Sequence, residues 1–159
     1  MHLKSIEYQK KVLNPWIFRT GMFFRLPSVF FWGIIVRSLD EKQCKLTLPY
    51  SWRTQNPFKS IYFAALAGAA ELSTGALCQL HLAGRSPHSM LVVHFQMEYL
   101  KKAASLITLS CYQGDDLKFF LDSLTAKGQT GTFKMLSTAR DISGDIVAQA
   151  YLTWSFKLK

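Results

Sequence analysis

Glu71 is the residue of this chain best placed to do chemistry, because it is the one charged side chain in a long apolar segment. The segment predicts a helix from about Ser60. Bulky residues such as Phe63, Leu66 and Leu77 lie opposite the acid on this helix. The residues on the acid's own side are small or short: Ser60, Ala64, Ala67, Gly68, Thr74, Gly75 and Cys78.

Small neighbours let a backbone or a ligand approach closely, so this face can hold a reactive group against the carboxylate. The alternative is a structural role, in which a buried Glu71 pairs with a Lys or Arg from elsewhere in the fold. Ser60 and Thr74 can hold a water beside the acid, or bond to local backbone instead. Asn56, which precedes Pro57, can orient a substrate or simply form a turn.

Composition indicates one globular domain. The chain has 159 residues, 49% of them hydrophobic and 18% charged, which is enough to bury a substantial core. Cys44, Cys78 and Cys111 are odd in number and widely spaced, so neither a disulfide framework nor a metal site is predicted. The start of the chain lacks the pattern of a secretory signal, and a reducing cytoplasm is the expected compartment.

Positive charge gathers in the N-terminal third. Residues 1–60 hold ten Lys or Arg against three acids, and between residues 16 and 32 the cations are interleaved with aromatic rings. This mixture suits a peripheral contact with a membrane surface, where aromatic rings meet headgroups and cations meet anionic lipid. The alternative is that the rings pack onto the domain and the cations are solvated. No nucleic-acid partner is predicted, since the cations are scattered and no recognition motif is present.

The remaining elements follow from periodicity and turn signals. Alternation and length predict strands over 33–38, 43–49, 91–99, 105–112, 132–140 and 146–157, and a short helix after Gly114. Within 91–99 the apolar set is Leu91, Val93, Phe95, Met97 and Tyr99. Two strands, a long helix and four further strands predict an α+β domain in which an antiparallel sheet curls around one helix.

Several stretches resemble the hotdog-fold thioesterase-like superfamily, over about residues 33–157. They are the loop and helix start at 56–66, the mid-helix segment in which Glu71 precedes Gly75 by four residues, the strand end at 98–103, and the closing hairpin at 141–154. The helical insertion near 116–124 is similar to a branch of unassigned function related to acyl-CoA thioesterases. The resemblance divides the chain into a basic, aromatic helical segment over 1–32 and a single hotdog domain over 33–159.

The resemblance implies an acyl-thioester hydrolase, with acyl-CoA as the expected substrate and no cofactor. It implies a homodimer or a dimer of dimers with active sites at the subunit interface. Glu71 would be the general base or nucleophile, and a backbone amide near Phe63 or Ala64 would polarise the carbonyl. Asn56, Ser60, Tyr62, Phe63, Ala64 and Thr74 would surround the substrate. Lys101 and Lys102, at the expected mouth of the acyl tunnel, would contact phosphates.

One departure from the family pattern leaves a second function open. Tyr62-Phe63-Ala64 stands where these families carry a triplet with two glycines, so side chains limit the approach of a ligand to that backbone. The alternative is therefore a noncatalytic protein that binds a fatty-acyl group or lipid, associated with a membrane through residues 1–32.

Overall fold

A computed structural model describes all residues from Met1 to Lys159. The chain starts with three short helices, α1 (Leu3–Leu13), α2 (Pro15–Arg25) and α3 (Pro27–Trp32). Proline opens the second and third of these, since its fixed φ suits the first helical position. The side chain of Asn14 accepts bonds from the backbone amides of Trp16 and Ile17 and so caps α2. The N-terminal segment is helical, as predicted.

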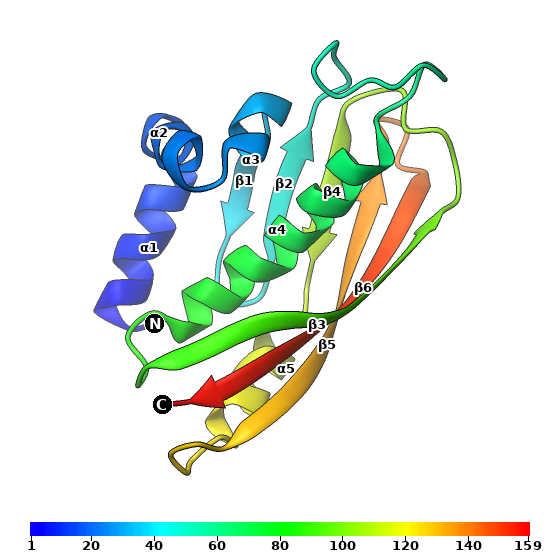
Figure 1. Cartoon of the computed structure of the whole chain (residues 1–159). Coiled ribbons are helices and arrows are strands. Elements are labelled where there is room, and N and C mark those ends of the chain that lie inside the picture. Colours follow the sequence, from blue (N-terminus) through cyan, green and yellow to red (C-terminus); the bar gives the residue numbers. More distant parts are fainter.

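The sheet is antiparallel throughout. Its strands are β1 (Ile35–Leu39), β2 (Cys44–Leu48), β3 (His88–Tyr99), β4 (Ile107–Cys111), β5 (Thr130–Arg140) and β6 (Ile146–Leu158), in the spatial order β1-β2-β4-β5-β6-β3. It curls around the long helix α4 (Phe63–Leu82), while the short helix α5 (Gly114–Asp122) lies near the far end of α4 (Figure 1). The predicted α+β architecture, two strands, a helix and four strands, is confirmed.

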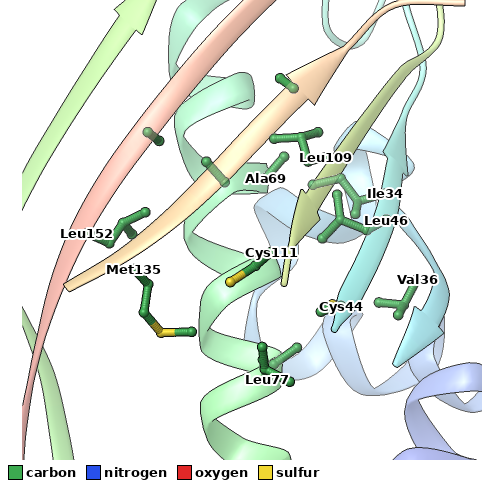
Figure 2. Packing of buried hydrophobic residues seen from close by; sticks show 14 of the residues in the cluster. Ile34, Val36, Cys44, Leu46, Ala69, Leu77, Leu109, Cys111, Met135 and Leu152 are labelled. Carbon is green, nitrogen blue, oxygen red and sulfur yellow. The ribbon is translucent and has the colours of Figure 1, made fainter. Parts of the chain in front are cut away.

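The core lies between α4 and the concave face of the sheet. Figure 2 shows Leu77 of α4 among side chains from β2, β4, β5 and β6. By length and composition α4 could cross a membrane, but 61% of its most apolar window is buried by the rest of the protein. It is therefore the core helix of this domain.

Helix α4 begins at Phe63, three residues later than predicted, because Asn56 organises the preceding loop. Its side-chain oxygen accepts hydrogen bonds from the backbone amides of Phe58 and Ser60, and Lys59 takes a positive φ of 58°. The Ile61 amide donates a hydrogen bond to the carbonyl of Ala103, which ties this loop to the segment between β3 and β4. Ser60 therefore lies in the loop and does not share the helix face of Glu71.

A bulge in β3 changes which of its side chains face α4. The pairing with β6 shifts between Val92 and His94, leaving Val93 as the extra residue. Before the bulge Met90 and Val92 face the helix side, opposite the buried Phe156 and Trp154. After it, Phe95, Met97 and Tyr99 do so. The single alternating set predicted for 91–99 is therefore wrong before the bulge, because Leu91 and Val93 are exposed and Val92 packs against the core.

Candidate active site

Glu71 lies in the middle of α4, half-buried, with a carboxylate that has no ionic partner. None of the ion pairs in the structure involves it, and no side chain donates a hydrogen bond to it. Within one protomer the structural-pairing alternative therefore finds no support. Burial raises the pKa of Glu71 above its usual range, since desolvation disfavours the charged form.

A cavity of about 270 Å³ opens at this carboxylate. Its walls come from α1, α4, β3, β6 and the α2–α3 turn: Tyr8, Leu26, Glu71, Leu72, Gly75, Ala76, Gln79, Met90 and Trp154. Most of these walls are apolar, so a carboxylate here is a stronger base than one in water. We call this space the Glu71 cavity.

The small residues beside Glu71 have two different explanations. Gly68 accommodates the indole of Trp32, because a Cβ there would lie 2.6 Å from a ring carbon. Gly75 is different, since an added Cβ would lie 3.3 Å from a carboxylate oxygen of Glu71 and 3.4 Å from Trp154. The small face of α4 is thus partly filled by α3, and the open space is confined to the neighbourhood of Gly75.

Thr74 supports the wall of the Glu71 cavity and does not line it. Its hydroxyl donates to the carbonyl of Glu71 at 3.0 Å and accepts from the indole nitrogen of Trp154 at 3.0 Å. The second bond holds Trp154 against Gly75. The hydroxyl is occupied by both contacts, which matches the backbone-bonding alternative considered for Thr74.

The other predicted site residues gather at the N-terminal end of α4, around a cavity of about 620 Å³. This entrance cavity is lined by Asn56, Ser60, Tyr62, Phe63, Lys101 and Lys102, together with Pro57, Phe58, Ile61, Leu66, Tyr99, Leu100 and Ala103. Ala64 is half-buried in the first turn of α4 and lines neither space. Glu71 lies eight positions after Phe63, which is about 12 Å along a helix axis.

Two backbone donors at the start of α4 are free. The amides of Phe63 and Ala64 have no acceptor, and Tyr62 at the N-cap provides no side-chain bond. The carbonyl of Phe63 accepts from the hydroxyl of Tyr99 at 3.3 Å, which ties this end of α4 to the end of β3. The helix start therefore carries two amides without acceptors, and Phe63, which bears one of them, lines this cavity.

The two lysines have different surroundings. The ammonium of Lys101 lies 2.7 Å from Asp141 and 2.6 Å from Asp145, and these hydrogen bonds raise the pKa of Lys101 to about 12. Lys102 donates only to the carbonyl of Phe58, at 3.2 Å. Its charge is not neutralised, and Lys102 is the better of the two for an anionic ligand.

The three cysteines lie in the core and are not candidate nucleophiles. Cys44 on β2 is the cross-strand neighbour of Cys111 on β4, and both are free and fully buried. Burial raises the pKa of Cys44 to about 12 and that of Cys111 to about 11. Their thiolates are therefore disfavoured.

Several residues of the Glu71 cavity could not be found from the sequence. Tyr8, Leu26, Met90 and Trp154 come from four separate segments, and no spacing links them to Glu71. The usable signals were local to α4: the single charge of Glu71 in an apolar helix and the four-residue spacing from Glu71 to Gly75.

A curled antiparallel sheet wrapped around one long helix is the hotdog fold, and in this chain the helix carries an acid, Glu71, near its middle. The chain belongs to the family described as Domain of unknown function (DUF4442), whose model matches residues 14–156. The sequence matches no curated protein.

Solved structures share this fold over nearly the whole chain. A Pseudomonas aeruginosa protein of unknown function, described as a probable thioesterase, has 16% identity and a TM-score of 0.77, with 100% of this chain and 99% of that chain covered. A Chlorobaculum tepidum protein of unknown function has 16% identity and a TM-score of 0.80, with 99% and 98% covered. A Shewanella oneidensis putative thioesterase has 13% identity and a TM-score of 0.75, with 97% and 99% covered.

Proposed function

We propose that the protein hydrolyses acyl thioesters, with acyl-CoA as the expected substrate, in a homodimer whose active sites combine Glu71 of one copy with the start of α4 of the other. The observation that carries the proposal is the unpaired, half-buried carboxylate of Glu71 in an apolar cavity, with its pKa raised. Thiol release from acyl-CoA esters of increasing chain length is the direct test.

Strand β3 is the surface that supports a dimer. It is twelve residues long, lies at an edge of the sheet, and exposes Leu91, Val93, Phe95 and Tyr99. The other edge, β1, is covered by α1, whose Gln9 side chain donates to the carbonyl of Leu39. A long apolar edge strand is a template for pairing with another chain, and a second copy satisfies it with two-fold symmetry.

Antiparallel pairing of two β3 strands would unite the two half-sites. Within one copy β3 runs antiparallel to α4, because Tyr99 bonds to Phe63 while the Gln79 amide contacts the sulfur of Met90 at 3.1 Å. Pairing about the middle of β3 sets the Tyr99 end of one copy beside the Met90 end of the other. The free amides at Phe63 and Ala64 of one copy are thereby brought toward the Glu71 cavity of the second copy. A dimer of dimers would contain two such pairs of copies.

This arrangement supports a simple hydrolysis. Glu71 takes a proton from a water whose oxygen attacks the thioester carbonyl carbon, and the amides of Phe63 and Ala64 donate hydrogen bonds to the developing oxyanion. The carbon–sulfur bond then breaks, and the proton held by Glu71 passes to the leaving sulfur. The products are a carboxylic acid and a thiol. Direct attack by Glu71 as nucleophile would instead break the carbon–sulfur bond, release the thiolate and form a mixed anhydride, which water would hydrolyse to the carboxylic acid and free Glu71.

The other predicted residues at this end of α4 have structural roles around the entrance cavity. Asn56 and Ser60 shape the loop before α4, with the hydroxyl of Ser60 donating to the Asn56 side chain at 3.2 Å. Tyr62 and Phe63 form the apolar wall, and their rings meet edge to face. The proposed setting is a reducing cytoplasm.

The pH dependence of hydrolysis should report the buried acid. Glu71 acts only when ionised, so kcat/KM should rise as pH increases through its pKa. Because burial raises that pKa, the rise should lie above the value of about 4.3 typical of an exposed Glu. A pH profile of kcat/KM from pH 4 to 8 measures this. A profile that stays flat down to pH 4 would contradict a role for a buried carboxylate.

Lys102 should affect recognition of the phosphate-bearing carrier more than Lys101 does. Lys102→Ala is expected to raise KM for acyl-CoA several-fold, while Lys101→Ala should raise it less, because two aspartates already neutralise Lys101. The defect of Lys102→Ala should shrink at high salt, where the wild type loses the same attraction. The measurement is KM at two ionic strengths for acyl-CoA and for a phosphate-free thioester. An equal rise in KM for both substrates would rule out the phosphate contact.

A second candidate function is noncatalytic binding of a fatty-acyl group or lipid. Two observations favour it. Phe63 and Ala64 place side chains where a glycine pair would leave the backbone bare. The N-terminal helices expose Trp16 by 82% and Phe24 by 77% beside Lys and Arg residues, which suits a membrane surface. Binding of acyl-CoA or of anionic vesicles without thiol release would favour this candidate.

A further inference from the structure

A hollow of about 680 Å³ lies outside both cavities, between the N-terminal helices and α4. We call it the N-terminal groove. Its walls are Ile17, Phe18, Met22 and other residues of α2, Tyr8 and Val12 of α1, and Leu72 and Ala76 of α4. The volume is within the range of small-molecule sites, and the walls are mainly apolar.

The N-terminal groove adjoins the Glu71 cavity. Tyr8, Leu72 and Ala76 line both spaces. A linear molecule with one end at the Glu71 carboxylate can therefore continue past these three side chains and lie under α2. The route stays within one copy of the chain and leads away from the β3 edge, so it does not compete with the proposed partner for space.

Gly21 is the residue that keeps the groove open. It lies in the interior of α2, where glycine is destabilising relative to alanine. Nothing lies within 4 Å of the position that a Cβ would take, so no close packing requires glycine there. Gly21 also lines the groove. A ligand bound in the groove would account for a glycine at this position, because a larger side chain would occupy the space of the ligand.

The charges of the wall suit an alkyl chain. The wall contains no acid, and its two cations, Lys11 and Arg25, are exposed. Their methylene stems can cover an alkyl chain while the charged ends stay in water. Trp16 and Phe24 stand at the outer rim and offer flat apolar contact to its far end.

We propose that the N-terminal groove holds the acyl chain of a long-chain thioester whose carbonyl lies at Glu71, so that the protein selects long chains over short ones. This inference rests on the proposed function for the position of the carbonyl. It adds the substrate class and assigns a binding role to α1 and α2.

The test uses probes that bind without reacting: the thioethers tetradecyl-CoA and butyl-CoA, measured by isothermal titration calorimetry. The wild type is expected to bind tetradecyl-CoA at least tenfold more tightly than butyl-CoA. Gly21→Leu fills the groove from α2 and should weaken tetradecyl-CoA binding about tenfold or more, with a much smaller effect on butyl-CoA. Its melting temperature should be no lower than that of the wild type, because a helix glycine is replaced.

Two further variants make the result specific. Thr20→Phe fills the same groove from the next wall position and should reproduce the loss. Glu7→Leu adds the same side chain as Gly21→Leu to an exposed position of α1 outside the groove, and should bind both probes as the wild type does. Unchanged tetradecyl-CoA binding in folded Gly21→Leu and Thr20→Phe would overturn the inference, as would equal losses for both probes.

A parallel thiol-release assay separates this inference from the proposed function. If the binding pattern holds but the wild type hydrolyses no thioester, the groove assignment stands and the proposed function fails. If long-chain thioesters are hydrolysed equally by the wild type and by Gly21→Leu, the proposed function stands and the groove assignment fails.

Discussion

Glu71→Gln should lower kcat for thioester hydrolysis by about 10² or more while the protein remains folded. Glutamine keeps the volume of the side chain and removes the base. No ion pair or side-chain donor is lost, because the carboxylate has neither. Thiol release and thermal melting of the same preparations measure the two effects.

The melting curve has its own predicted sign. Burial raises the pKa of Glu71 in the folded protein above its pKa in the unfolded chain. Stability is therefore lost as pH rises from the unfolded-state pKa through the folded-state pKa, because the buried carboxyl must then ionise. Glu71→Gln removes this penalty, and its melting temperature should exceed that of the wild type at neutral pH and match it in acid. Glu7→Gln, the same exchange at an exposed site, should change neither activity nor melting. Unchanged hydrolysis together with unchanged melting in Glu71→Gln would contradict the account.

Phe95→Glu should convert the protein into monomers and remove most hydrolysis, by about 10² or more in kcat/KM, since the proposed site needs two copies. Phe95 is 40% exposed near the middle of β3. Antiparallel pairing with a second copy brings equivalent residues near this point close together, so the substitution sets like charges against each other. Light scattering at micromolar concentration and thiol release measure mass and activity.

Ile142→Glu is the matched control. Ile142 is also an exposed apolar residue, but it belongs to the turn between β5 and β6 and not to β3. This variant should keep both the dimer mass and the activity. A wild type that scatters only as a monomer would contradict the interfacial site, and so would an active monomeric Phe95→Glu.

The order of elements followed from the sequence because each strand and helix carries its own periodicity. The β5–β6 hairpin and α4 are the clearest cases, since alternation and a long apolar run are local signals. The errors arose where backbone geometry depends on contacts distant in sequence. The bulge at Val93 and the turn set by Asn56 each move a boundary or a face without changing the local composition.

The site was predicted in part for the same reason. Glu71 stood out because one charge interrupts an apolar helix. The residues around it did not, because Tyr8, Met90 and Trp154 meet Glu71 only after the sheet has curled and the N-terminal helices have docked. Gly68 shows why the sequence was misleading here. Its small size suggested space for a ligand, but the indole of Trp32 fills that space in the structure.

Mixed dimers test most directly whether one active site is built from two copies of the chain. Phe63→Pro removes the amide at the first position of α4, where proline is tolerated. Phe63→Ala keeps that amide and controls for loss of the ring. Phe63→Pro and Glu71→Gln should each be nearly inactive alone.

Unfolded, mixed in equal amounts and refolded, these two variants should form mixed dimers in which one site has both an intact Glu71 and an intact Phe63 amide. Half of the dimers would be mixed and each would have one working site of two, so thiol release should recover to about a quarter of the wild-type rate. A mixture no more active than the sum of its two components, from a wild type that survives the same treatment, would contradict a site shared between subunits.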